Sequence, residues 1–551
     1  MVVPEPKVWR AARPHVVRVA RAVKPGVVRM THAVKPGAAR VARVVKPGVV
    51  RVTSAVGARS SRLAGSAKNL TNLQLTAGAA TLGLVLSAGA VLAAGPWDST
   101  GQRTAERDWA ASHGHEGGAD HGRNSGTSSG TAQGAPKPAP SAPSVLTGLG
   151  GASGADSMPG GDALAAVLDP LLEVPALGPR RAAAVVDVKT GELLYGKGAD
   201  DALTPASTTK IATAAAALSA AGPDHRIETR VVLEPGSDEV VLVGGGDPTL
   251  TAHKDAGGYA SLRTLADRTA AALAKRHLNE ITLAYDTSLY DGPELHTIGR
   301  DFNLAPVTAL MVDEARLNDS TSGTAERSLD PPADATRAFA DLLADRGIKA
   351  TKSADGGPVT ASKKAEEIAS VSSAPLSTLV ERMLTHSDND IAEALARQVA
   401  LAAGEPASFE GGGAAIKKEL KKLELPLGDI AFADGSGLSR GDRLTPGLLT
   451  SLLAAAASPS HPELRPVLTG LPVAGFTGTL RTRYPADSTG TGVVRAKTGT
   501  LTGVNTLAGT VVDADGRLLS FAFMATQTPS RDPAQAALDT AASALANCGC
   551  R

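Results

Sequence analysis

The chain has 551 residues, enough for two or three domains, and its 56 basic and 55 acidic residues leave a net charge of +1. That balance conceals an asymmetry, because residues 1–74 carry 15 basic residues and one acid, a net of +14, and the rest of the chain carries a net of −13. The chain is therefore not one evenly charged globule. Two cysteines exclude a disulfide-built scaffold and a cysteine-rich metal module.

The basic segment, residues 1–74, contains an eleven-residue repeat that ends three times in Lys-Pro-Gly. Proline and glycine end a helix, so each unit is too short to bury a core. A disordered cytoplasmic tail and adhesion to anionic lipids both fit this pattern. Nucleic acid would fit the charge, but no aromatic residues are interleaved with the basic ones, so we expect no nucleic-acid partner.

Residues 75–95 form a run of 21 residues without a charge, which suffices to cross a bilayer as a helix. Because the basic segment precedes this run, the positive-inside rule predicts a single-pass anchor with a cytoplasmic N-terminus and an extracellular catalytic part. Secretion after signal cleavage is the alternative, which the long leader disfavours. Residues 96–161 are rich in Gly, Ser and Pro and predict a flexible linker, so the folded part would span 162–551.

The folded part opens with an apolar run at 182–188, a Lys-Thr-Gly-Glu turn and a second apolar run, which together predict a β-hairpin. Residues 207–221 are apolar nearly all round and predict a helix buried at the centre of the domain. In the first turn of this helix, Ser207 and Lys210 share a face. A serine becomes nucleophilic when a base removes its proton, and a lysine can do so when burial or a second cation lowers its pKa.

Two further motifs follow this Ser-x-x-Lys pair. A Ser-Asp-Asn triplet at 387–389 lies between two predicted helices, where a helix cap is the simpler interpretation. A Lys-Thr-Gly-Thr run at 497–500 follows two valines, whereas an earlier Lys-Thr-Gly at 189–191 is the hairpin turn and precedes the serine. Each motif alone is weak evidence, but all three in this order arise rarely by chance.

In this order the motifs resemble those of the penicillin-recognising serine enzymes, which comprise penicillin-binding proteins and serine β-lactamases. The 180 residues from Ser207 to Ser387 exceed what a class A β-lactamase leaves. They resemble the class C low-molecular-mass penicillin-binding proteins, the D-alanyl-D-alanine carboxypeptidase/endopeptidase family. Stretches at 244–248, 306–310, 434–439 and 471–475 look similar to the same family, so that the resemblance covers about residues 164–546.

The resemblance implies a role for each residue near the serine. Ser207 would attack the carbonyl of the penultimate D-alanine of a peptidoglycan stem peptide, and Lys210 would take its proton. The amides of Ser207 and Thr500 would form the oxyanion hole. Ser387 would relay a proton to the leaving amine, and Asn389 would hold the substrate amide.

The third motif is implied to bind substrate. Lys497 with Thr498 would receive the substrate's carboxylate, with Gly499 and Thr500 completing the substrate-binding strand. Lys497 would also help to keep Lys210 neutral, since like charges lower an amine's pKa. Water would hydrolyse the acyl-enzyme, β-lactams would act as covalent inhibitors, and the resemblance implies no metal and no cofactor.

The predicted fold class is α+β. Apolar runs at 505–513 and 518–525 predict a second hairpin, and a helix at 533–546 ends the domain. With the opening hairpin these give an antiparallel sheet, built from both ends of the domain and covered by helices, in the β-lactamase/transpeptidase-like manner that the resemblance implies. Residues 225–370 carry short apolar runs with many turn signals and predict an inserted, β-rich accessory domain.

These observations predict a serine D,D-peptidase that hydrolyses terminal D-Ala-D-Ala bonds, with peptide crosslinks as a second candidate substrate. The alternatives are a β-lactamase and a non-catalytic penicillin- or wall-binding sensor, which would not require Lys210, Asn389 and Lys497 together. The end of the chain, Cys-Gly-Cys at 548–550, fits a metal clip, an exposed dithiol or a disulfide. An oxidising exterior favours the disulfide.

Overall fold

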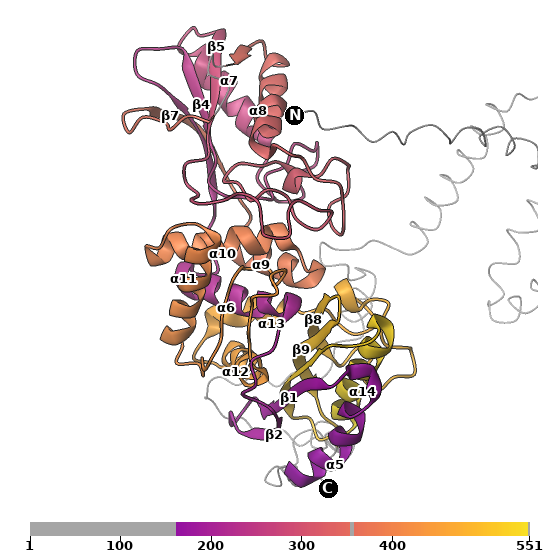
Figure 1. The fold of residues 1–551 in the computed structure, drawn as a ribbon. Helices are drawn as coiled ribbons and strands as arrows, with labels where there is room; N and C mark the ends of the chain where they lie inside the picture. Colours follow the sequence, from indigo (N-terminus) through magenta and orange to yellow (C-terminus); the bar gives the residue numbers. More distant parts are fainter. Residues whose placement is uncertain (1–160, 353–357, 549–551) are drawn as a thin grey trace, which may run out of the picture. The chain divides into compact units, whose positions relative to one another are not determined.

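The computed structural model describes residues 161–352 and 358–548 (Figure 1). The predicted basic tail, the predicted anchor, nearly all of the linker and Cys550 lie outside these residues. Within the described ranges, no helix combines the length and the apolar character needed to cross a membrane.

A five-stranded antiparallel sheet, in the order β2-β1-β10-β9-β8, joins the first and last strands of the described chain. Its strands are β1 (Arg180–Asp187), β2 (Leu193–Lys197), β8 (Arg495–Leu501), β9 (Val504–Val512) and β10 (Leu518–Thr526). The pairing of β1 with β10, which sets Val185 opposite Phe521, closes the sheet between the two predicted hairpins. The prediction of an α+β fold with an antiparallel sheet covered by helices is thus confirmed.

Two hydrophobic cores lie on the two faces of this sheet, because neighbouring residues of a strand point to opposite sides. In β10, Phe521 and Phe523 pack with α5 (Gly161–Leu172) and α14 (Arg531–Asn547), whereas Ala522 and Met524 pack with a larger helical layer. That layer comprises α6 (Thr209–Ala221), α9 (Leu376–His386), α10 (Asn389–Ala403), α11 (Phe409–Lys422), α12 (Pro446–Ala457) and α13 (Arg465–Thr469). Short 3-10 turns are η2 (Pro175–Leu177), η3 (Ala206–Thr208), η4 (Asp313–Ala315), η5 (Pro462–Leu464) and η6 (Gly478–Leu480).

A second five-stranded sheet, in the order β6-β5-β4-β3-β7, lies between α6 and α9 in the chain. Its strands are β3 (Glu228–Leu233), β4 (Glu239–Val243), β5 (Glu280–Asp286), β6 (Lys349–Lys352) and β7 (Glu366–Ser372). Strands β4, β5 and β6 run parallel, so the chain must cross over between them, and the crossovers contain α7 (Leu262–Ala274) and α8 (Pro331–Ala344). Both helices pack on one face of the sheet, so the segment is a mixed α/β unit rather than the expected β-rich one (Figure 1).

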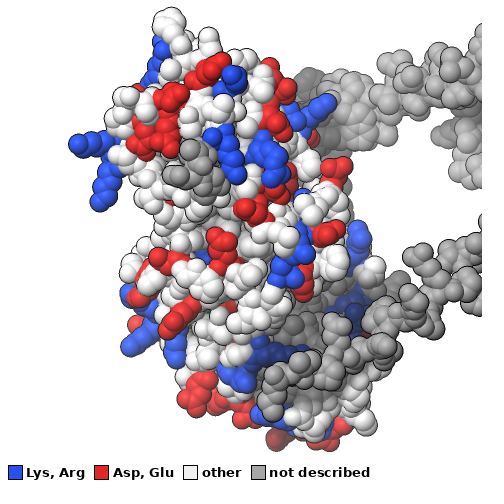
Figure 2. Space-filling view, turned by 45° about the horizontal axis from the view of Figure 1, so that its top comes forward, with Lys and Arg blue, Asp and Glu red and all other residues white. Residues whose placement is uncertain are grey.

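Charged side chains are not gathered by sign on the described surface seen in Figure 2, where Lys and Arg lie among Asp and Glu. The excess of acid in the sequence after residue 74 therefore produces no broad single-sign patch among the described residues of this face. A charged substrate would meet individual side chains here rather than one extended field.

Candidate active site

Ser207 lies in η3, a single 3-10 turn directly before α6. The backbone bends sharply there, because Ala206 adopts a left-handed conformation with φ of 49°. The Oγ1 of Thr506, on β9, donates to the carbonyl of Pro205 at 2.7 Å and ties the bend to the sheet. The α-helix consequently begins at Thr209, two residues later than the sequence predicts, and Lys210 stands in its first turn.

Lys210 is completely buried, and its Nζ contacts three acceptors. These are the Oγ of Ser207 at 3.3 Å, the Oδ1 of Asn389 at 2.6 Å and the backbone carbonyl of Ser436 at 2.7 Å. A hydroxyl in direct contact with a lysine amine is the arrangement that lets the amine remove its proton. The predicted Ser-x-x-Lys pair is therefore close enough for general-base catalysis.

Burial lowers the pKa of Lys210 to about 8, while the carboxyl groups of Asp434, Glu393, Asp388 and Asp442 act in the opposite direction. About a tenth of the molecules would then hold this lysine neutral at pH 7. Burial, one of the two causes that the sequence suggests, is the largest cause of this lowered pKa. The charge of Lys210 in turn lowers the pKa of Lys497.

The Ser-Asp-Asn triplet connects α9 to α10, and each of its residues has a structural position. Ser387 ends α9 in a left-handed conformation (φ 59°, ψ 39°), and the carboxylate of Asp388 caps α10 by accepting from the amide of Ile391 at 3.0 Å. Asn389 donates from Nδ2 to the carbonyl of Asn303 at 3.0 Å. That bond leaves Oδ1 facing Lys210, so the cap interpretation and the catalytic one apply to the same triplet.

Lys497, on β8, is also completely buried and donates to the Oγ of Ser387 at 2.8 Å and to the carbonyl of Thr498 at 2.7 Å. Burial first, and then the charge of Lys210, holds the pKa of Lys497 well below its usual range. The third donor position of this amine is not used by any described residue, and a substrate carboxylate could occupy it. Ser387 lines the active-site cavity, so its hydrogen bond with Lys497 links this buried amine to the cavity.

The rest of the third motif completes the strand beside the serine. The hydroxyls of Thr498 and Thr479 are 2.8 Å apart, and Gln535 donates to the Oγ1 of Thr500 at 3.1 Å. Gly499 has no room for a side chain, because a Cβ there would lie 2.1 Å from the Oγ1 of Thr506 and 2.6 Å from the carbonyl oxygen of Pro205. Glycine thus lets β8 approach the turn that carries Ser207.

These elements enclose a cavity of about 420 Å³. Five predicted site residues line it, namely Ser207, Ser387, Asn389, Thr498 and Thr500, and residues Asn303, Arg316 and Arg327 of the inserted segment form another wall. Lys210 and Lys497 are buried next to it. A second cavity, of about 340 Å³, shares Arg316 and His386 with the first.

The sequence motifs do not reveal several residues of the site, two of which hold catalytic side chains in place. Asn303 orients Asn389, and the Ser436 carbonyl belongs to the stretch at 434–439, which was noted for similarity but given no role. The letters Asp-Gly-Ser-Gly predict a tight turn, but they do not indicate which residue the turn contacts.

Comparisons with known proteins agree with this geometry. A family model described as the D-Ala-D-Ala carboxypeptidase 3 (S13) family matches residues 164–327 and 316–546. The chain is 35% identical over 430 residues to a carboxypeptidase of Mycobacterium tuberculosis, covering 75% of this chain and 90% of that protein. It is 37% identical over 383 residues to carboxypeptidase DacB of Mycolicibacterium smegmatis, covering 66% of this chain and 80% of that protein.

The fold is similar to the crystal structure of penicillin binding protein 4 (dacB) from Haemophilus influenzae, with a TM-score of 0.57 at 22% identity, covering 69% of this chain and 99% of that one. A complex of that protein with a novel β-lactam gives a TM-score of 0.53 at 23% identity, covering 69% of this chain and 98% of that one. The chain therefore belongs to the S13 family of D-Ala-D-Ala carboxypeptidases, which are serine peptidases, and this is the family that its motifs predict.

Proposed function

We propose that this chain is a penicillin-sensitive serine D,D-peptidase, which hydrolyses the terminal D-Ala-D-Ala bond of peptidoglycan stem peptides through an acyl-enzyme on Ser207. The observation that carries the proposal is the position of Lys210, buried 3.3 Å from the serine hydroxyl and with its pKa lowered to about 8. A base with a pKa near the working pH is well suited to remove the serine proton.

In the first half of the reaction, Ser207 attacks the carbonyl of the penultimate D-alanine as its proton passes to Lys210. The developing oxyanion would accept hydrogen bonds from the amides of Ser207, in η3, and Thr500, on β8, two residues that line the cavity. The terminal D-alanine places its carboxylate against Lys497 and the hydroxyl of Thr498. Asn389, fixed by its two hydrogen bonds, presents its amide to the substrate backbone.

In the second half, the bond between the carbonyl carbon and the leaving nitrogen breaks, and the nitrogen takes a proton from Ser387. Ser387 is supplied in turn through its hydrogen bond with Lys497. Water then attacks the acyl-enzyme: one of its protons passes through Ser387 to Lys497, and Lys210 returns its proton to the Oγ of Ser207 as the shortened peptide leaves. The transfers within the enzyme use two hydrogen bonds of the structure, between Lys210 and Ser207 and between Lys497 and Ser387.

A β-lactamase, the first alternative, must release its penicilloyl group quickly. In class A β-lactamases a glutamate activates the water for this step. Among the described residues that line the cavity, Asp388 is the one carboxylate, and it is occupied in capping α10. We therefore expect penicillin to stay bound, as in a penicillin-binding protein, rather than to be turned over.

The test uses a fluorescent penicillin and a D-Ala-D-Ala pentapeptide. The wild-type chain should be labelled covalently and release D-alanine, and the Ser207→Ala variant should do neither. Labelling that survives this substitution would refute the assignment. A wild type that is labelled but releases no D-alanine would instead support the non-catalytic sensor.

A second candidate activity, hydrolysis of peptide crosslinks, is supported by the second cavity. The two cavities share Arg316 and His386, the residue before Ser387, which would pass its proton to the leaving amine. A carboxypeptidase releases only D-alanine, whereas a crosslink releases a second stem peptide, which needs additional space there. Product analysis on a crosslinked dimer and on the pentapeptide would separate the two activities, and cleavage of the pentapeptide alone would exclude the second.

We also propose that the catalytic part works outside the cell membrane, held by a single-pass anchor at residues 75–95, with the basic tail against anionic lipids. The uncharged run and its basic flank in the sequence support this arrangement. Release of the protein from membranes by salt, without detergent, would refute the anchor.

A further inference from the structure

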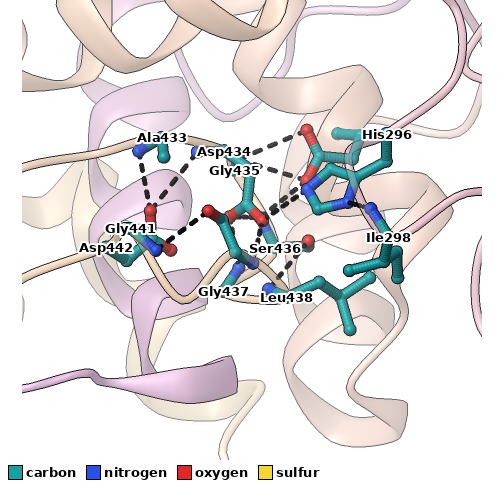
Figure 3. Close-up of polar contacts among 12 residues, drawn as sticks. His296, Ile298, Ala433, Asp434, Gly435, Ser436, Gly437, Leu438, Gly441 and Asp442 are labelled. Atoms are coloured by element: carbon teal, nitrogen blue, oxygen red, sulfur yellow. Dashed lines mark hydrogen bonds and ion pairs between the residues drawn. The ribbon is translucent and has the colours of Figure 1, made fainter.

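Asp434 organises the loop at 434–439 through four hydrogen bonds to its buried carboxylate (Figure 3). Its Oδ1 accepts from the amides of Ser436 at 3.1 Å and Gly437 at 2.6 Å. Its Oδ2 accepts from the amide of Ser439 at 2.6 Å and from Nε2 of His296 at 2.9 Å. Because a carboxylate with four donors is strongly held, the loop is fixed as one unit.

His296 comes from the inserted segment, between β5 and α8, and its ring is constrained at both nitrogens. Nδ1 accepts from the amide of Ile298 at 3.2 Å, so the proton of the neutral ring is on Nε2, which donates to Asp434. The ring also stands edge-on to Phe409 of α11, with ring centroids 5.2 Å apart. His296 thus joins the inserted segment to a loop of the helical layer 138 residues further along the chain.

The same loop supports the catalytic turn from the other side. The carbonyl of Ser436 accepts from Nζ of Lys210 at 2.7 Å, and the carbonyl of Gly435 accepts from Oγ1 of Thr213 at 2.6 Å. At Gly437 the backbone lies against the residue before the nucleophile, because a Cβ there would be 1.9 Å from the carbonyl oxygen of Ala206. A displacement of this loop would therefore move Lys210 relative to Ser207.

We propose that His296 and Asp434 are a positioning pair, through which the inserted segment holds the 434–439 loop, and with it Lys210, in the geometry that acylation requires. The inference rests on the proposed function, since it concerns the same lysine. Neither residue touches the reacting atoms, and both act through the carbonyl of Ser436. The inserted segment thereby acts on the base as well as lining the cavity, and no motif of the sequence indicates this second role.

The charge of the pair can be tested separately from its position. Lys210 faces carboxyl groups of Asp434, Glu393, Asp388 and Asp442, and the amine of Lys497 is a further titratable neighbour. Although burial opposes it, donation from His296 and from the loop amides holds the pKa of Asp434 below its usual range. Burial, and then the charge of Asp434, raises the pKa of Asp442 to about 9. These two carboxyl groups therefore carry one negative charge between them at neutral pH, and both must be changed to remove it.

The positional arm compares His296→Leu with His296→Gln in the full chain, by the rate of labelling with a fluorescent penicillin. His296→Leu removes the donor to Asp434 and should lower the limiting acylation rate about 10- to 100-fold, with little change in the penicillin concentration that gives half of that rate. His296→Gln can still donate to Asp434 and should recover most of the rate. His461→Leu is the matched control, because it removes a histidine–carboxylate pair of 3.1 Å from residues that do not line the cavity, and it should label as the wild type does.

The electrostatic arm measures acylation against pH. In the Asp434→Asn/Asp442→Asn double variant, the loss of the negative charge should move the midpoint of the acid limb to lower pH, and the maximal rate should fall as well. Asp442→Asn alone replaces a protonated acid by an amide of the same shape and should leave the midpoint in place. A merely structural role would lower the melting temperature without moving the midpoint.

Either of two results would refute the proposal. One is a folded His296→Leu variant with the wild-type limiting rate of acylation, and the other is an Asp434→Asn/Asp442→Asn variant whose acid-limb midpoint does not move. Circular dichroism and thermal melting verify that each variant is folded, and the double variant decides the question if His296→Leu does not fold. A wild-type chain that penicillin fails to label would refute the proposed function, which is a separate outcome.

Discussion

The contact between Gly499 and the turn before Ser207 allows a sharp test of the active-site geometry. In a Gly499→Ala variant the new Cβ would lie 2.6 Å from the carbonyl oxygen of Pro205, and real Cβ contacts are essentially never shorter than 3.0 Å. The two backbones must therefore separate by at least about 0.4 Å, and by about 0.9 Å if Thr506, whose Oγ1 would be 2.1 Å away, keeps its position. Thr506 cannot rotate away without losing its hydrogen bond to Pro205.

The expected consequence is a misplaced nucleophile in a folded protein. Since a displacement of about 1 Å can cost about 100-fold in rate, we expect Gly499→Ala to lower the limiting rate of acylation about 10- to 100-fold. The assay is stopped-flow labelling with a fluorescent penicillin. Gly516→Ala is the matched control, because Gly516 has a φ of 83° but no atom within 4 Å of its added Cβ, so it should cost about 1 kcal/mol of stability and leave acylation unchanged. A folded Gly499→Ala variant that acylates within a factor of about two of the wild type would refute the argument.

Three further predictions follow from the buried charges. Because the pKa of Lys210 is lowered to about 8, the wild-type acylation rate should rise about tenfold between pH 7 and pH 9, and a flat profile would exclude this lysine as the base. Burial lowers the pKa of Lys497, and a bound substrate carboxylate should raise it again. Binding of a D-Ala-D-Ala peptide to the Ser207→Ala variant should therefore take up a proton and become weaker as the pH rises. Calorimetry in two buffers of different ionisation enthalpy would detect the proton uptake, and binding heats that do not depend on the buffer would contradict it. Arg327→Met should lower the free energy of unfolding by about 3 kcal/mol at pH 8, because it leaves Asp390 unpaired in a site where both side chains are at most 2% exposed. The loss of unfolding free energy should be smaller at pH 6, because burial raises the pKa of Asp390 to about 7 and a proton can then neutralise this carboxyl group in place of the arginine. Equal losses at pH 6 and pH 8 in urea titrations would contradict this prediction.

Hairpins, helices and short motifs depend on residues close together in the sequence, and these features could be predicted from it. Alternating apolar runs with short turns predict the hairpins of the catalytic sheet, and the three motifs in order predict five of the residues that line the cavity. The bend at Ala206 was not predictable, because alanine rarely adopts a positive φ and only the packing of β8 and β9 against the turn imposes it here. The pairing of His296 with Asp434 was hidden for a similar reason, since the two residues meet only after the inserted segment has docked on the helical layer.

The inserted segment was predicted as β-rich because its short apolar runs and frequent turns are typical of strands. The periodicity of apolar residues predicts strands, but it does not reveal whether neighbouring strands pair in parallel or antiparallel. Parallel pairing of β4 with β5 and of β5 with β6 requires crossovers, and α7 and α8 occupy these connections and cover one face of the sheet. The direction in which two strands pair depends on contacts between residues that are far apart in the sequence.

Asp388 combines a structural and an electrostatic role, and two substitutions separate them. Asparagine caps a helix as well as aspartate does, so Asp388→Asn should keep the bond to the amide of Ile391 and leave the unfolding free energy nearly unchanged. Asp388→Ala loses the cap and should cost about 1 kcal/mol. Both variants remove a carboxylate that raises the pKa of Lys210, so both should move the acid limb of acylation to lower pH. If only the alanine variant moved it, the shift would come from the loss of the cap rather than from the charge, and the electrostatic part of the argument would be wrong.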